Sequence, residues 1–219
     1  PNEVGSSTLI RDAALRAGAT LHEYELDAQF RCGGCEDYIN WVNSLLHIGD
    51  VEPLVWDSTG AFDFQIVESP LELEGAIREK QGQGYSARLT AGFCWPWSDP
   101  NTDGSLAHDV VIGEWSMPWN ARPDSQLAEG IPKSHYWATD PAGIEQVGCI
   151  YTAQGFEFDY VGVIFGRDLR YDRSSGRWNP DITKHCDAVV RRGGDQFEDL
   201  VRNVYRVLLT RGLKGCYVY

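Results

Sequence analysis

Three acidic residues near the middle of the sequence could do chemistry as a group. Glu157 and Asp159 precede a short apolar run in TAQGFEFDYVGVIF, and Asp168 follows it. Clustered carboxylates can hold the divalent cations of a metal-dependent nuclease. Such a site usually has a lysine on a neighbouring strand, whereas the nearby cation here is Arg167. A solvated edge of a sheet is therefore the favoured interpretation, and the nuclease is kept as an alternative.

Two cysteines in the segment Cys32-Gly-Gly-Cys35 suggest zinc binding or redox chemistry. A structural zinc site needs four ligands, and the sequence offers no second closely spaced pair of cysteine or histidine residues. A redox pair of this spacing would follow a strand and open a helix. The two glycines equally suit a turn, so a structural role is favoured and no metal site is predicted.

Two arginines are better candidates for contact with phosphate. Arg31 lies just beyond a predicted strand in LDAQFRCG, and Arg211 lies at the end of a predicted helix in VYRVLLTRGLKG. An arginine at a helix C-terminus is also favoured by the helix dipole, which leaves a structural role open for Arg211. Because no G-x-x-x-x-G-K-[ST] segment is present, no loop here is expected to cradle the phosphates of a nucleotide by itself.

Alternating strands and helices must position these residues. Residue patterns predict strands at 20–28, 62–67, 86–93, 148–151, 160–165 and 215–219. Apolar residues spaced three and four apart, with helix start and stop signals, predict helices at 37–46, 70–77 and from Phe197 to the stop at Gly212. This alternation predicts an α/β fold around a mainly parallel sheet flanked by helices.

An irregular segment rich in tryptophan interrupts this alternation. From Trp95 to Val147 the sequence is dominated by Pro, Gly, Asn, Asp and Trp, with one predicted hairpin around residues 109–117. An irregular stretch longer than about 15 residues inside a domain usually has a function. We therefore expect a functional insertion at about residues 98–147.

Composition limits the classes of function. The chain has 219 residues and a formal net charge of −13, so contact with a polyanion such as nucleic acid must be local. No apolar stretch approaches the roughly 20 residues that span a membrane, so no membrane partner is expected. The scattered cysteines indicate reduced thiols and a cytoplasmic location. Because the chain starts at Pro1 and ends at Tyr219 inside an apolar run, we expect a piece of a longer protein.

Several segments carry a resemblance to a known family. LDAQFRCG, IYTAQGFEFDYVGVIF and NVYRVLLTRGLKGCYVY resemble motifs IV, V and VI of superfamily 1 helicases, in that order. SARLTAGFCWPW and GEWSMPWNAR resemble the bacterial Schlafen-group-3-like DNA/RNA helicases, a family of unknown function. The resemblance covers nearly the whole chain. It implies that residues 1–219 form the second RecA-like domain of a two-domain motor, with a fold of the P-loop NTPase type.

The resemblance implies roles for the two arginines. Arg31 matches the arginine of motif IV and Arg211 that of motif VI, which reach the γ-phosphate of ATP across the domain cleft. Phosphoryl transfer spreads negative charge over the transferred oxygens, and an arginine finger is worth about 10³–10⁵ in rate. Thr210 would help to position Arg211.

Motif V implies further contacts with ATP. Gln154, Gly155 and Glu157 match its Q-G-x-E pattern. The glycine permits close approach of the backbone, and the glutamate would hydrogen-bond the ribose or orient the cleft.

Contact with DNA or RNA is also implied. Thr152 in motif V is one candidate, and Trp95 and Trp97 could stack on bases, which contributes about 1–3 kcal/mol per base. Burial beneath the insertion is the competing interpretation of both tryptophans and is slightly favoured.

These resemblances lead to one functional prediction. The chain would be the C-terminal motor domain of an ATP-dependent DNA/RNA helicase or translocase, with ATP and Mg²⁺ held mainly by an N-terminal RecA-like domain of the same parent chain. This domain alone is expected not to hydrolyse ATP. A metal-dependent nuclease and a non-catalytic regulatory or protein-binding domain are the alternatives.

Overall fold

A five-stranded parallel sheet is the centre of the molecule. The computed structural model describes residues 7–22, 31–50, 52–57, 60 and 62–219. The strand order is β1-β9-β6-β2-β5, and each neighbouring pair is parallel. These strands are β1 (Asp63–Ile66), β2 (Ala87–Ala91), β5 (Val147–Gly148), β6 (Phe158–Ile164) and β9 (Gly212–Val218). The predicted α/β fold with a parallel central sheet is therefore confirmed, and it is consistent with a RecA-like fold.

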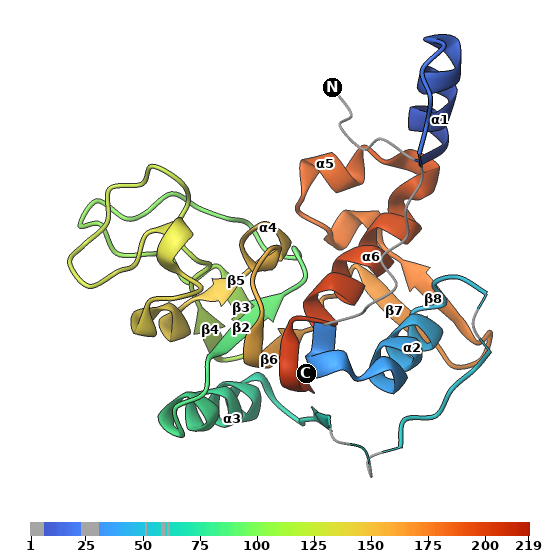
Figure 1. Cartoon of the computed structure of the whole chain (residues 1–219). Coiled ribbons are helices and arrows are strands. Elements are labelled where there is room, and N and C mark those ends of the chain that lie inside the picture. The colour runs from blue at the N-terminus through green and yellow to red at the C-terminus, as the bar shows by residue number, and fades with distance from the viewer. Residues whose placement is uncertain (1–6, 23–30, 51, 58–59, 61) are drawn as a thin grey trace.

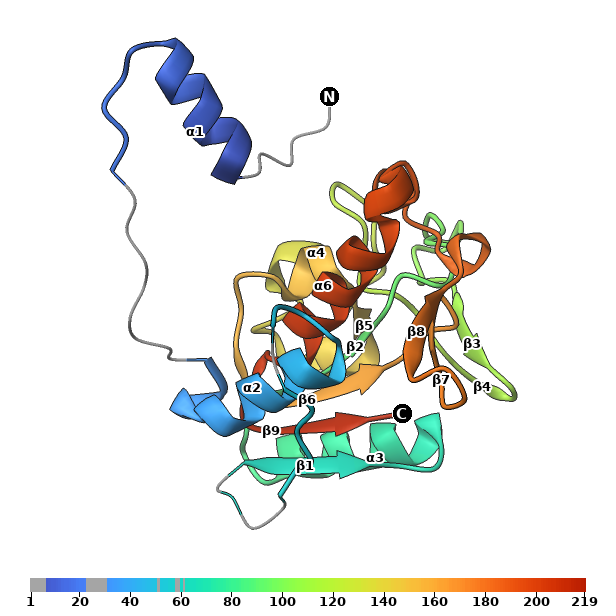
Figure 2. The same cartoon turned by 90° about the vertical axis from the view of Figure 1, so that its right-hand side faces the viewer.

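Helices cover both faces of this sheet (Figures 1 and 2). Figure 2 shows α2, α4 and α6 on one face and α3 on the other. The α-helices are α1 (Ser7–Arg16), α2 (Glu36–Leu45), α3 (Pro70–Gly82), α4 (Ile150–Ala153), α5 (Ala188–Arg191) and α6 (Phe197–Leu209). In the described part of the chain, no helix is long and apolar enough to cross a membrane.

Shorter elements join the helices and strands. Two antiparallel hairpins pair β3 (Val110–Ile112) with β4 (Trp115–Met117), and β7 (Leu169–Asp172) with β8 (Arg177–Pro180). The 3₁₀ helices are η1 (Arg31–Gly34), η2 (Ser134–Tyr136), η3 (Pro141–Glu145), η4 (Ile182–Lys184) and η5 (Gly194–Gln196).

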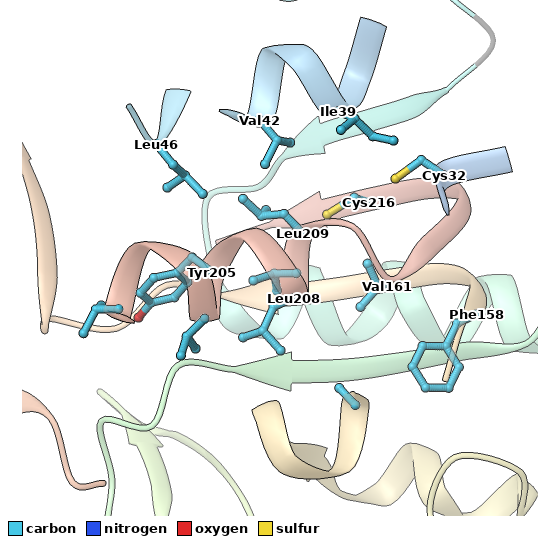
Figure 3. Close-up of a cluster of buried hydrophobic side chains, with 14 of the residues drawn as sticks. Cys32, Ile39, Val42, Leu46, Phe158, Val161, Tyr205, Leu208, Leu209 and Cys216 are labelled. Atoms are coloured by element: carbon cyan, nitrogen blue, oxygen red, sulfur yellow. The ribbon is translucent and has the colours of Figure 1, made fainter. Parts of the chain in front are cut away.

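The main core lies between the sheet and the α2–α6 layer (Figure 3). Along α6, Val201, Tyr205 and Leu208 are fully buried, because residues spaced three and four apart lie on one face of a helix. Ile39 and Val42 of α2 are buried in the same cluster.

Helix α3 packs closely on the opposite face of the sheet. Ser69 caps it by accepting a hydrogen bond from the Glu72 amide, and proline occupies the first turn. Leu73 and Ile77 are fully buried. A Cβ atom at Gly162 in β6 would lie 2.8 Å from the Ile77 side chain, so glycine at this position permits the close packing of helix and strand.

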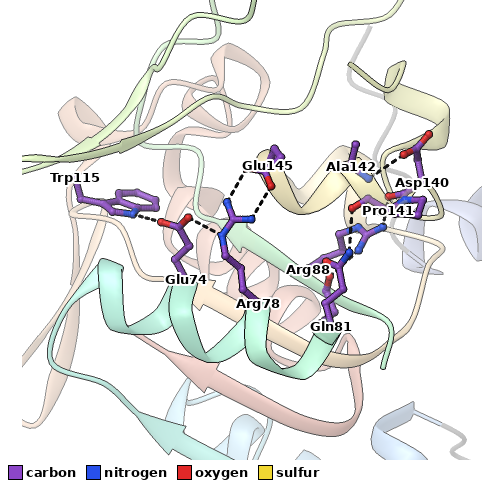
Figure 4. Close-up of polar contacts among 10 residues, drawn as sticks. Glu74, Arg78, Gln81, Arg88, Trp115, Asp140, Pro141, Ala142 and Glu145 are labelled. Atoms are coloured by element: carbon purple, nitrogen blue, oxygen red, sulfur yellow. Dashed lines mark hydrogen bonds and ion pairs between the residues drawn. The ribbon is translucent and has the colours of Figure 1, made fainter. Parts of the chain in front are cut away.

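The insertion is tied to the sheet by a buried arginine (Figure 4). Arg88, in strand β2, donates from Nε to the Trp137 carbonyl at 2.9 Å and from Nη2 to the Asp140 carbonyl at 2.6 Å. Burial lowers the pKa of this guanidinium. Because carbonyl oxygens accept hydrogen bonds from the guanidinium, its charge can stay inside the protein.

A second set of contacts joins the insertion to α3. Arg78 donates to both carboxylate oxygens of Glu145 at 2.6 and 2.7 Å. Glu74, one turn earlier, binds Arg78 at 2.8 Å and accepts from the Trp115 indole at 2.7 Å. The segment predicted to be irregular is therefore ordered by specific polar contacts.

Some predicted elements differ from the structure. The strand predicted at 148–151 is wrong beyond residue 148, because α4 begins at Ile150. The Thr152 hydroxyl accepts a hydrogen bond from the Cys149 amide and caps that helix. In the predicted strand 20–28, residues 20–22 are not in a strand, and residues 23–28 lie outside the described part.

Candidate nucleotide-binding face

The sheet brings the two segments that resemble motifs V and VI together at the edge where its strands begin. Residues 154–157 directly precede β6, and residues 210–211 directly precede β9. These strands are neighbours, with Phe158 opposite Gly212. The Phe158 amide donates to the Arg211 carbonyl at 2.9 Å. Segments more than 50 residues apart in the sequence thus share one edge, which we call the amino edge.

Arg211 is held at this edge by backbone carbonyls. Its side chain donates from Nε to the Val207 carbonyl at 3.0 Å and from Nη1 to the Phe156 carbonyl at 3.2 Å. The residue is only 5% exposed. No hydrogen bond from Nη2 is formed within the described residues. These two bonds therefore fix the orientation of the guanidinium.

Arg31 lies close to Arg211. Arg31 is the first residue of η1, and η1 packs on the start of β9. The packing is close, because a Cβ atom at Gly33 would lie 2.7 Å from the Leu213 carbonyl oxygen. Gly33 also has φ of +62°, so both its conformation and its surroundings require glycine. Burial lowers the pKa of Arg211, and the positive charge of Arg31 lowers it further. The structure thus brings the two predicted arginines together.

Glu157 adds a carboxylate to this cluster. It is exposed, and its negative charge acts on Arg211 in the opposite direction to Arg31, by raising the pKa of the guanidinium. Gly155 has φ of +94° with open space around it, a conformation that favours glycine. Gln154 is exposed beside it. The three residues of the predicted Q-G-x-E pattern therefore lie on the surface next to the arginines.

Thr210 faces the protein rather than the surface. It is 2% exposed, and its hydroxyl donates to the Arg206 carbonyl at 2.8 Å. This bond closes the last turn of α6 and sets the backbone from which Arg211 extends.

The carboxylates of the nuclease alternative do not cluster. Glu157 precedes β6 and Asp168 follows it, so the seven-residue strand separates them by roughly 20 Å. Asp159 is paired with Lys214 at 2.9 Å and accepts from the Ser86 amide. Among the described residues, no group of three acidic, histidine or cysteine side chains is arranged to hold a metal ion.

The pair of cysteines is built into the core. Cys32 is buried, and burial raises the pKa of its thiol to about 12. Reactive cysteines instead have a lowered thiol pKa. Cys35 donates its amide to the Cys32 carbonyl at 3.0 Å, which forms the turn that the two glycines suggested.

The predicted nucleic-acid contacts lie toward the other end of the strands. Trp95 and Trp97 are both partly buried, and their indole nitrogens donate to the carbonyls of Val111 and Asn120, each at 2.9 Å. The Thr152 hydroxyl donates to the Asn120 side chain at 3.0 Å. The insertion therefore covers the tryptophans in part, and their contact with nucleic acid stays a prediction.

A buried polar network was missed in the sequence. Asp168 is fully buried and lies 2.6 Å from His185 Nδ1, while Tyr205 donates to its other oxygen at 2.6 Å. Tyr205 also accepts from the Gly166 amide at 2.8 Å. These residues come from separate elements with no regular spacing, so no local sequence signal could identify them.

Comparisons with known proteins relate the chain to one family and one relative. The family described as "Schlafen group 3, DNA/RNA helicase domain" matches residues 1–219. "Uncharacterized protein YPL245W" of Saccharomyces cerevisiae is 26% identical over an alignment of 216 residues, which covers 90% of this chain and 45% of that protein. The chain thus spans less than half the length of that relative, and a bacterial origin stays a prediction. No solved structure matches the chain. Since the match covers every residue, the chain belongs to the Schlafen group 3 DNA/RNA helicase domain family.

Proposed function

We propose that this domain forms one wall of an ATP site in a longer helicase-like motor. Arg31 and Arg211 would contact the γ-phosphate, and the other wall would come from a preceding RecA-like domain. The observation that carries the proposal is the meeting of Arg31, Arg211 and Glu157 at the amino edge, although they come from three distant segments.

Electrostatics supports an anionic ligand at this edge. The charge of Arg31 lowers the pKa of both Arg211 and Arg206, after the larger effect of burial on each. Positive charges brought together repel one another, and a bound polyanion relieves the repulsion. Perturbed groups of this kind are common at functional sites.

The fixed position of Arg211 suits phosphoryl transfer. Two carbonyl bonds orient its guanidinium before any ligand arrives, and such preorganisation avoids reorganisation during the reaction. The Nη2 group and Arg31 would then donate to the oxygens that gain charge. Bound Mg²⁺, held mainly by the preceding domain, would neutralise part of the phosphate charge.

The test is ATP turnover in the longer protein that carries this domain. We expect Arg31→Ala and Arg211→Lys each to lower kcat by at least about tenfold, which corresponds to about 1.4 kcal/mol of transition-state stabilisation. Lysine keeps the charge of Arg211 but cannot reproduce its planar set of donors.

A matched control separates this effect from general charge loss. Arg122 is a partly exposed arginine of the insertion, paired with Asp99 at 2.9 Å. Arg122→Ala is expected to keep kcat within about twofold of the wild type, since surface ion pairs contribute only about 0–1 kcal/mol. If folded Arg31→Ala and Arg211→Lys proteins also kept wild-type turnover, the ATP-site proposal would be wrong. The domain would then be a non-catalytic regulatory or protein-binding module.

A further inference from the structure

A cavity of about 530 Å³ lies at the other edge of the sheet, where the strands end. It is lined by residues that follow β2 and β6, by Tyr219 after β9, and by the turn between β3 and β4. In Figure 2 these strands run toward the end marked C, on the side of the two hairpins. In open α/β sheets, ligands bind outside the carboxyl ends of the strands. A volume of about 300–1,000 Å³ is typical of small-ligand sites.

The charge of this cavity is opposite to that of the whole chain. Arg167 and Lys184 line it, and no Asp or Glu is among its lining residues. Both side chains are exposed, and within the described residues neither takes part in an ion pair. In a chain with net charge −13, such a local concentration of positive charge favours an anionic ligand.

Aromatic rings lie beside these cations. Trp95 lines the cavity, and its indole nitrogen donates to Val111 at 2.9 Å, which fixes the ring. Phe165 is stacked on Tyr205, with ring centroids 4.0 Å apart and planes 7° apart. Tyr219 lines the same cavity. Rings fixed beside cations suit a ligand that combines an aromatic base with phosphate.

A network of hydrogen bonds next to the cavity holds its walls in place. The Tyr205 hydroxyl accepts a hydrogen bond from the Gly166 amide and donates one to Asp168. Asp168 in turn forms a hydrogen bond with His185. The Cys186 amide donates to the Phe93 carbonyl at 2.7 Å, which ties the segment after η4 to the end of β2. Gly166 lies beside Arg167, and His185 lies beside Lys184, so this buried network fixes the chain directly next to both cations.

We propose that this cavity binds a nucleotide unit, with the base against Trp95 and Tyr219 and the phosphate against Arg167 and Lys184. The source that the structure favours is single-stranded DNA or RNA, because a third exposed cation, Arg170 of β7, follows Arg167 by three residues. The carboxylate of Asp181 lies near both Arg170 and Lys184 and offsets part of their charge. Arg170 is also exposed, so a second phosphate could follow the first.

This site is separate from the nucleotide-binding face and extends the proposed function. It rests on that function by assuming that the domain acts on nucleic acid. Its test does not depend on Arg31, Arg211 or ATP, so the failure of either proposal can be recognised without the other.

Binding is measured on the 219-residue chain by fluorescence anisotropy, with a labelled oligo(dT) of about 12 nucleotides, since single-stranded sites span about 4–16 nucleotides. We expect Lys184→Glu to raise Kd by about tenfold and to lower the slope of log K against log salt by about 1 or more. Lys133→Glu is the matched control, because Lys133 is an exposed lysine of the insertion with no ion pair in the described part. It changes the net charge equally and should alter Kd by less than about twofold.

A footprint on Cys186 tests the location independently of charge. Cys186 is exposed and lines the cavity, so bound oligonucleotide should slow its alkylation by N-ethylmaleimide, measured by mass spectrometry of its peptide. Cys35, partly exposed beside η1, should react at an unchanged rate.

The outcomes distinguish the possible sources of the nucleotide. Weaker oligonucleotide binding by Lys184→Glu, with protection of Cys186, supports a nucleic-acid strand. Protection of Cys186 by uridine monophosphate, with no tighter binding of the oligonucleotide, supports the same site with a free nucleotide as its ligand. The proposal would be overturned if neither the oligonucleotide nor uridine monophosphate protected Cys186. It would also be overturned if Lys184→Glu and Lys133→Glu changed Kd equally.

Discussion

The Tyr205 hydroxyl is a single group on which two segments depend. It accepts from the Gly166 amide at 2.8 Å and donates to Asp168 at 2.6 Å, and the residue is fully buried. Tyr205→Phe keeps the ring but removes the hydroxyl, so the Gly166 amide and one Asp168 oxygen each lose a hydrogen bond. A buried unpaired group costs about 1–3 kcal/mol. We therefore expect the free energy of unfolding to fall by about 2–3 kcal/mol, measured by urea denaturation with tryptophan fluorescence.

Tyr136→Phe provides the control for this change. Tyr136 is 56% exposed, and its hydroxyl forms no hydrogen bond within the described residues. Its substitution should change the free energy of unfolding by less than about 0.5 kcal/mol. An equally small effect of Tyr205→Phe would show that the network around Asp168 contributes little to stability.

At the scale of elements, the short edge strand β1 is secured by one carboxylate. Asp63 accepts from the Tyr217 hydroxyl of β9 at 2.6 Å and from Lys80 of α3 at 3.3 Å. Burial alone would raise the pKa of Asp63, but hydrogen bonds from Tyr217, Gln65 and Lys80 outweigh it, so the pKa is lowered. The folded state therefore binds this proton less readily than the unfolded chain does. The stabilisation is fully present above the unfolded pKa of about 3.9 and is lost as the pH falls through the lower, folded value.

This argument predicts how Asp63→Asn depends on pH. Urea denaturation from pH 7 to pH 3 should show a constant loss of unfolding free energy above about pH 5, and a shrinking loss below about pH 4. Asp99→Asn removes a carboxylate whose side chain is 83% exposed, and it should stay within about 0.5 kcal/mol of the wild type at neutral pH. A loss for Asp63→Asn that stayed the same down to pH 3 would contradict the role of the carboxylate charge.

The elements with a clear pattern could be predicted from the sequence. Helices α2, α3 and α6 were predicted because apolar spacing and start signals agreed, and β6 and β9 because their runs are apolar. Helix α4 was missed, since four residues carry no helical period. The hairpin β7–β8 was also missed, although its sequence LRYDRSSGRWNP alternates around a Ser-Ser-Gly turn. Its many arginines obscured the strand pattern.

The candidate site was only partly predictable. Motif order identified Arg31 and Arg211, and the structure brings them together. The carbonyl partners of Arg211 could not be foreseen, because the register of β6 against β9 determines which backbone groups it meets. The cavity beside Arg167 and Lys184 depends in the same way on several loops that meet only in the folded chain.

At the scale of the whole molecule, two strands connect the two proposed sites. Strand β6 begins after Glu157 and ends before Phe165, and β9 begins after Arg211 and ends before Tyr219. Each strand thus starts at the amino edge and ends at the cavity lined by Arg167 and Lys184. The strands are neighbours in the sheet and are paired along most of their length. If binding at one site shifts either strand, the residues at the other end of that strand should therefore shift as well.

This connection predicts that nucleic acid and ATP turnover are coupled in the longer protein. Coupling free energies between sites are typically 1–3 kcal/mol, so saturating oligo(dT) should raise ATP turnover by about fivefold or more. In Lys184→Glu, the oligonucleotide concentration for half-maximal activation should rise by the same factor as Kd, whereas Lys133→Glu should be activated as the wild type is. Activation at an unchanged concentration in Lys184→Glu would mean that the stimulating strand binds elsewhere. No activation of the wild type would mean that the two edges of the sheet act independently.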